Sequence, residues 1–124
     1  MDRKTGRLMD EINIENAKKF HLLLDTLQDK KQTYSEYYHL NRVWKFLKKE
    51  FRKNLIFPTK CIYETPNMIL VWSTDKYYAD LEISNNGFVS SFYKSRDEKI
   101  IFENNLGDST LPSLTWIDYM KKYN

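Results

Sequence analysis

The chain has 124 residues, of which 41% are hydrophobic and 15% aromatic, values typical of one folded domain and not of a disordered chain. It contains no apolar run near the roughly 20 residues of a membrane span, no signal-peptide core and a single cysteine, Cys61, so we expect one cytoplasmic domain, residues 1–124, that contacts no membrane. The net charge is +3, but residues 1–60 carry 14 Lys and Arg against 8 Asp and Glu, and residues 61–124 carry 6 against 9, which predicts two differently charged surfaces.

The first half of the chain, residues 1–57, is helical in pattern. Apolar residues recur at helical spacing from Ile14 to Gln28, which predicts an amphipathic helix with Asn13 as its N-cap. Residues 1–11 are polar and are expected to fray.

A second helix follows after a short connection. Thr33 and Glu36 have the spacing of a capping box and open this helix, which runs from Tyr34 to about Lys53. Its apolar residues step by three and four and form one stripe: Tyr37, Leu40, Trp44, Leu47 and Phe51. Because the connection is short, we expect the two helices to form an antiparallel hairpin.

Extended structure replaces the helical pattern after Pro58. Beta-branched and aromatic residues become frequent, and Asn85-Asn86-Gly87 is a hairpin signal. The expected strands are Lys60–Glu64, Met68–Ser73, Lys76–Ser84 and Phe88–Lys94, with Lys99–Glu103 as a further candidate. Pro112 suits the first turn of a helix that closes the chain.

These elements predict an α+β fold. Its expected parts are an N-terminal antiparallel helical hairpin over residues 1–57, a three- to four-stranded antiparallel β-meander over residues 58–103, and a C-terminal helix over residues 109–124.

Basic residues gather on the second helix, opposite its apolar stripe. At about 100° per residue, Arg42, Lys45 and Lys49 lie roughly 140–200° around the helix from Leu40, with Lys48 and Lys53 beside them. The candidates for partner binding are Arg42, Lys45, Lys48, Lys49 and Arg52. Such a ridge can follow a nucleic-acid backbone or an acidic protein surface. The alternative is an ordinary solvated helix face.

Tyrosine is frequent in this chain. Nine Tyr and three Trp exceed the needs of a core of this size, and both residue types are enriched at protein interfaces. The further candidates for partner binding are therefore tyrosines: Tyr34, Tyr38 and Tyr78 above all, and also Tyr37, Tyr77 and Tyr93. The alternative is that the tyrosines border the core and cover the sheet.

Asp80 and Glu82 are expected on one face of a single strand. Acidic pairs of this kind hold Mg²⁺ in nucleases, but the position where such a strand would need a lysine is Ser84. We therefore expect a solvated acidic face, which can also attract a basic partner.

No set of catalytic residues is evident. The chain contains no P-loop, dinucleotide-binding glycine motif or nucleophile elbow. His21 and His39 stand on different helices without a partner at metal-ligand spacing, and Cys61 has no basic neighbour in sequence. We predict no catalytic residues, no metal ligands and no cofactor.

The central segment contains, in chain order, Pro58, the strand Met68-Ile69-Leu70-Val71-Trp72, the strand Tyr78-Ala79-Asp80-Leu81-Glu82-Ile83, and Gly87. This arrangement resembles the pattern of small uncharacterised bacterial proteins encoded near toxin–antitoxin or phage-defence genes. The tryptophan stands one residue earlier than in the pattern. The resemblance implies an accessory role in a bacterial or phage conflict system and assigns no site residues.

The expected function is therefore non-enzymatic binding of a larger protein, such as an effector or nuclease, by an antitoxin, an immunity-like protein or an inhibitor of a defence effector. One alternative is a nucleic-acid-binding accessory protein that uses the basic ridge. A second alternative is a small metal-dependent hydrolase. The oligomeric state stays open.

Overall fold

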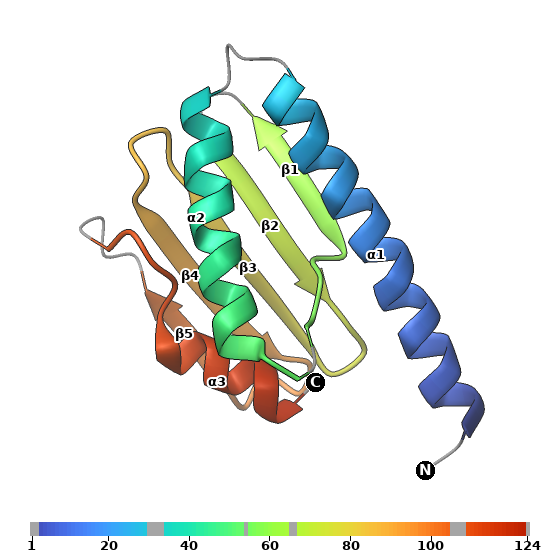
Figure 1. The fold of residues 1–124 in the computed structure, drawn as a ribbon. Coiled ribbons are helices and arrows are strands. Elements are labelled where there is room, and N and C mark those ends of the chain that lie inside the picture. The colour runs from blue at the N-terminus through green and yellow to red at the C-terminus, as the bar shows by residue number, and fades with distance from the viewer. Residues whose placement is uncertain (1–2, 30–33, 54, 65–66, 105–108, 124) are drawn as a thin grey trace.

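The computed structural model describes residues 3–29, 34–53, 55–64, 67–104 and 109–123. These residues form an α+β fold, as expected, in the order α1 (Arg3–Asp29), α2 (Tyr34–Phe51), β1 (Lys60–Glu64), β2 (Asn67–Ser73), β3 (Tyr77–Ile83), β4 (Val89–Ser95), β5 (Ile101–Asn104) and α3 (Leu114–Tyr123). Helices α2 and α3 lie across one face of the sheet, and α1 runs beside the β1 edge (Figure 1).

The described strands form one five-stranded antiparallel sheet in the order β1-β2-β3-β4-β5. The prediction of three to four strands was too low, because the candidate segment near residue 100 does pair with β4. A tight turn makes this pairing possible: Ser95 N donates to Ile100 O (2.9 Å), Ile100 N donates to Ser95 Oγ (3.0 Å), and Glu98 adopts a φ of 62°.

Helix α1 begins at Arg3, so the expectation of a frayed segment over residues 1–11 was wrong from residue 3 onward. Asn13 is not an N-cap. Its Nδ2 donates to Leu55 O (2.9 Å), and its Oδ1 accepts from Phe57 N (3.0 Å). This side chain therefore ties the middle of α1 to the segment that leads into β1.

The expected helical hairpin is not clearly formed. Phe20 of α1 packs against Trp44 of α2, with ring centroids 4.3 Å apart, but the two helices diverge, and the first turns of α1 extend past β1 (Figure 1). Of the expected capping pair, Thr33 lies outside the described residues.

Aromatic side chains dominate the core between the helices and the sheet. The indole ring of Trp72 on β2 meets that of Trp116 on α3 edge to face at 5.3 Å, and Trp116 Nε1 donates to Phe92 O (2.7 Å). Tyr93 stacks on both Tyr77 and Tyr119, each with a centroid distance of 5.2 Å. Tyr77 and Tyr93 are fully buried, so these two tyrosines belong to the core and not to an exposed binding surface, as the alternative explanation predicted.

Candidate functional site

Alternation along the strands gives the sheet two different faces. On β3, Tyr77, Ala79, Leu81 and Ile83 are buried beneath the helices, whereas Tyr78, Asp80 and Glu82 point the other way and are partly exposed. In the described part of the chain, no helix lies on this second side (Figure 1). We call it the open face.

The strand register assigns the members of the open face. One row crosses all five strands and contains Lys60, Val71, Asp80, Phe92 and Glu103. The neighbouring rows contain Ile62, Ile69, Glu82 and Ser90 on one side, and Ser73, Tyr78, Lys94 and Ile101 on the other. Apolar and acidic side chains are thus interleaved, with Lys60 and Lys94 toward the edges.

Carboxylates crowd the middle of the open face. Burial raises the pKa of Asp80, the Tyr78 hydroxyl that donates to it opposes this rise, and the negative charges of Glu82 and Glu103 add to it. The pKa of Tyr78 is raised in turn by burial and by its hydrogen bond to Asp80. Asp80 therefore lies in surroundings that disfavour its charged form.

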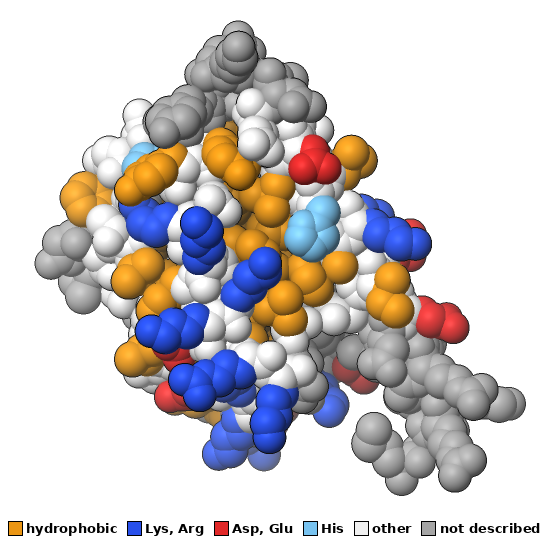
Figure 2. All heavy atoms as spheres, viewed as in Figure 1, with side chains coloured by type: hydrophobic (Ala, Val, Ile, Leu, Met, Phe, Trp, Pro, Cys, Tyr) orange, Lys and Arg blue, Asp and Glu red, His pale blue; other side chains and the backbone are white. Residues whose placement is uncertain are grey.

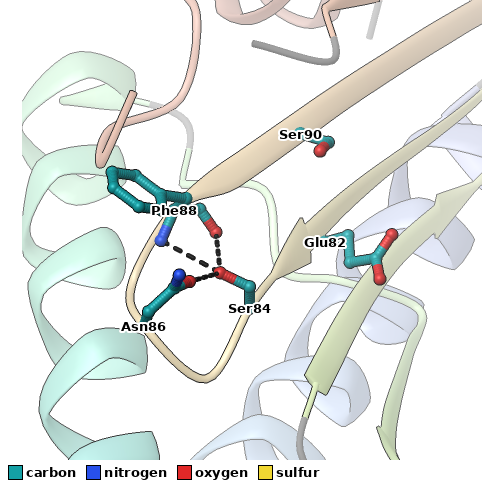
Figure 3. A pocket seen from close by; sticks show the side chains of 5 residues that line it. All are labelled: Glu82, Ser84, Asn86, Phe88 and Ser90. Carbon is teal, nitrogen blue, oxygen red and sulfur yellow. Dashed lines mark hydrogen bonds between the residues drawn. The ribbon is translucent and has the colours of Figure 1, made fainter. Parts of the chain in front are cut away.

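A shallow hollow of about 420 Å³ lies where the open face meets the β3–β4 hairpin. It is lined by Glu82, Ser84, Asn86, Phe88 and Ser90 (Figure 3). The Ser84 hydroxyl accepts from Phe88 N (3.1 Å) and lies within hydrogen-bond distance of Phe88 O (3.0 Å) and of Asn86 Oδ1. These bonds hold the hairpin and hence the shape of the hollow.

Glycine is required in this hairpin. Gly87 has a φ of +90°, and a Cβ at this position would lie 2.7 Å from Cε1 of His39 on α2. The Asn-Asn-Gly signal in the sequence therefore marks both the turn and a close approach between the hairpin and α2.

Arg42 was predicted as a partner-binding residue of the basic ridge, with an ordinary solvated helix face as the alternative, but the structure places its side chain between elements of the fold. It is partly buried, its Nη2 donates to Gly87 O (2.8 Å) and Thr110 O (3.1 Å), and its Nη1 lies 3.3 Å from His39 Nδ1. Its guanidinium carbon also lies 5.9 Å from the ring centroid of Tyr38, whose side chain is 54% exposed. Arg42 therefore fastens the β3–β4 hairpin and the segment before α3 to α2.

The remaining predicted cations do lie together. The exposed residues Lys45, Lys48, Lys49, Arg52 and Lys53 follow the C-terminal half of α2, and we call them the basic surface. Figure 2 shows Lys and Arg side chains running down this side of the molecule. At its end, Arg52 adopts a φ of 44° and its Nε donates to Lys49 O (3.3 Å), so the chain turns away immediately after the helix.

The predicted partner-binding residues therefore divide between two sides of the molecule. Tyr78 lies on the open face, whereas the basic surface and Tyr38 lie on α2, beyond the other face of the sheet. The side chain of Tyr34 lies outside the described residues. Sequence reasoning singled out Asp80 and Glu82 but missed Ile69, Phe92 and Ile101, because only the strand register shows that these residues share a face with them.

The surroundings of Cys61 do not favour nucleophilic chemistry. Burial raises the pKa of the Cys61 thiol to about 11, which disfavours the nucleophilic thiolate at neutral pH. In the ranges that the structure describes, no three His, Cys, Asp or Glu side chains come together as metal ligands, and no helix is long and apolar enough to cross a membrane. Comparison of the chain with protein-family models, curated proteins and solved structures gave no match, so the functional argument rests on the surfaces themselves.

Proposed function

We propose that the chain is a non-enzymatic protein-binding module that uses its open face. The observation that carries this proposal is that the described helices leave one side of the sheet uncovered. Apolar side chains lie on that side, among them Ile69, Phe92 and the 61% exposed Ile101. Five strands about 4.8 Å apart and roughly 20 Å long give a face of about 400 Å². Apolar side chains that lie exposed together among polar ones are typical of protein-interaction sites.

Within this proposal, the partner is a larger protein such as an effector or nuclease, and the module acts as an antitoxin, an immunity-like protein or an inhibitor. The resemblance of the segment from Pro58 to Gly87 to proteins encoded near such systems supports this form of the proposal. The single cysteine supports a cytoplasmic site of action.

Affinity capture from the native host followed by mass spectrometry tests the proposal. We expect Phe92→Ser combined with Ile101→Ser to abolish capture of a specific partner, because both side chains lie on the open face. The matched control is Leu22→Ser combined with Leu114→Ser, which removes apolar side chains that are 67% and 57% exposed on helices. Equal capture by the two variants would refute a binding role for the open face. Inhibition of the captured partner by the purified module then tests the inhibitor form.

A nucleic-acid-binding role is the second candidate, and the basic surface is the observation that favours it. The cations in the last turns of α2 lie exposed side by side, with Glu50 as the one acidic residue among positions 45–53 of that helix end. About four phosphate contacts would reduce affinity roughly 100-fold between 50 and 200 mM salt. Fluorescence anisotropy with an oligonucleotide, compared with Lys45→Glu/Lys49→Glu, measures this slope. Absence of binding at low salt rules the role out.

A further inference from the structure

We infer that the open face takes a basic, partly apolar segment of the partner protein and that an Arg or Lys side chain of this segment occupies the hollow beside Glu82. This inference rests on the proposed protein-binding function and specifies the chemistry of the partner.

The charge of the open face is the first argument. Asp80 and Glu82 stand two residues apart on the same side of β3, and in the described part of the chain neither carboxylate forms an ion pair. Lys94 lies in a neighbouring row, but its Nζ is already 2.8 Å from Oε1 of Glu98. A cation from another molecule would therefore supply charge that the chain itself does not supply at the centre of this face.

The composition of the hollow is the second argument. Its lining consists of a carboxylate, two hydroxyls, a side-chain amide and one aromatic residue, and no Lys or Arg. Oε1 of Glu82 accepts from Asn67 Nδ2 (3.1 Å), which holds the carboxylate in place at the sheet surface. Guanidinium and ammonium groups offer several N–H donors and no acceptor, so they match a lining rich in oxygen acceptors.

The apolar residues around the hollow indicate which other side chains the partner segment carries. Ile62 and Ile69 lie in the same row as Glu82, and Phe92 lies beside Asp80 in the next row. The aliphatic stem of an Arg or Lys can pack along such side chains while its charged end reaches the carboxylates. Apolar residues of the partner segment, on both sides of its basic residue, would cover the remainder of the open face.

Other occupants fit less well. Nucleic acid would bring phosphates against Asp80 and Glu82. A second copy docked sheet to sheet would oppose these carboxylates with their own equivalents, and like charges across an interface disfavour association. A second copy that presents its basic surface to the open face has the right charge, and this arrangement is an outcome of the test below.

The test uses a capped peptide that alternates arginine with valine, titrated into the ¹⁵N-labelled full chain. We expect amide shifts confined to the open face and the β3–β4 hairpin. A peptide with citrulline in place of arginine keeps the shape and loses the charge, so it should bind at least tenfold more weakly. Shifts that map to α2, equal binding of the citrulline peptide, or no shifts at millimolar peptide would each overturn the inference.

Charge-neutral variants locate the contact. Glu82→Gln and Asp80→Asn should each weaken peptide binding about tenfold, whereas the matched controls Asp25→Asn and Asp118→Asn, both exposed on helices, should leave it unchanged. The ¹⁵N spectrum of each variant verifies its fold. Salt-sensitive dimers in sedimentation experiments that disappear with Lys45→Glu/Lys49→Glu would show that a second copy occupies the face, and would overturn the inference.

Capture from the host separates this inference from the proposed function. If Phe92→Ser/Ile101→Ser abolishes capture and Asp80→Asn/Glu82→Gln leaves it intact, the protein-binding role stands and the basic segment is wrong. If neither pair of substitutions changes capture, both the proposed protein-binding role of the open face and the inferred basic segment are wrong. Loss of capture in both pairs, with retention in Asp25→Asn/Asp118→Asn, supports both.

Discussion

Arg42 on α2 donates a 2.8 Å hydrogen bond to the carbonyl oxygen of Gly87, 45 residues further along the chain. The same guanidinium reaches Thr110 O, 68 residues away. One residue of the predicted ridge therefore connects α2, the β3–β4 hairpin and the segment before α3. The hydrogen bonds of its guanidinium stabilise the fold. The exposed cations of the basic surface, and not Arg42, are therefore available to a partner.

Replacement of Arg42 should reduce stability. Arg42→Ala leaves the carbonyls of Gly87 and Thr110 without this donor, and hydrogen bonds to charged groups contribute about 1.5–3 kcal/mol each, so we expect a loss of about 2–3 kcal/mol after partial replacement by water. Urea denaturation measures the change. Lys45→Ala, on the same helix but exposed, should change stability by less than about 0.5 kcal/mol, and equal losses in both variants would contradict the role of Arg42.

A side chain at position 87 should be poorly tolerated. Gly87→Ala places a methyl group 2.7 Å from Cε1 of His39 and requires a φ of +90° that L-residues rarely adopt, so we expect a loss of about 2–3 kcal/mol. Thermal unfolding measures it. The double variant Gly87→Ala/His39→Ala lacks the imidazole ring. It should therefore recover the part of the stability loss that is due to the steric clash, but not the part that is due to the positive φ. If the stability losses of the two single variants simply add in the double variant, the close approach of position 87 to His39 does not affect stability.

Asn13 is predicted to control how firmly α1 is attached. Asn13→Ala removes a donor to Leu55 O and leaves Phe57 N without its acceptor, which should cost about 1–3 kcal/mol. Hydrogen exchange should accelerate in α1 more than in β3. Asn41→Ala on α2 is the control, and an equal effect on all elements would show that α1 does not open separately.

The Cys61 thiol should react slowly while the protein is folded. With its pKa at about 11 against an unperturbed 9.0, the thiolate fraction near pH 8 is about 100-fold lower than in the unfolded chain. A disulfide-exchange reagent added with and without urea measures the ratio. Because the folded state retains this proton to higher pH than the unfolded state, its contribution to stability is complete below pH 9 and is lost as the pH rises toward 11. Equal rates in the two states would contradict the burial of the thiol.

We expect the charged form of Asp80 to lower the free energy of unfolding of the protein. Its raised pKa means that the folded protein favours the protonated carboxyl, so stability associated with this group increases as the pH falls through the raised folded value. Asp80→Asn keeps an acceptor for Tyr78 and removes repulsion from Glu82 and Glu103, while Lys60 and Lys94 lie toward the edges of the same face. We expect a higher melting temperature than wild type at pH 7 and little difference near pH 3. Asp118→Asn is the control, and a lower melting temperature of Asp80→Asn at pH 7 would contradict this account.

Local patterns predicted the elements well where a continuous apolar stripe existed. The second helix was predicted from Tyr34 to about Lys53 and runs from Tyr34 to Phe51. This prediction was accurate because the apolar stripe of the helix faces the core along its whole length. The start of α1 was missed because residues 3–13 show no such stripe. The role of Arg42 within the fold was missed, and it was grouped with the partner-binding ridge, because the carbonyls that it binds lie 45 and 68 residues away in sequence. Asp80 and Glu82 could be placed together by alternation alone, whereas Phe92 and Glu103 required the pairing of strands.

The order of the sheet has a kinetic consequence. Each described strand pairs with the strand next to it in the chain, from β1 to β5, so every ladder closes only a short loop. Proteins whose contacts are close in sequence fold faster than sandwiches or barrels of similar size. We therefore expect the open face to assemble from a series of neighbouring hairpins, so that a newly made chain exposes its isolated strands to other proteins only briefly.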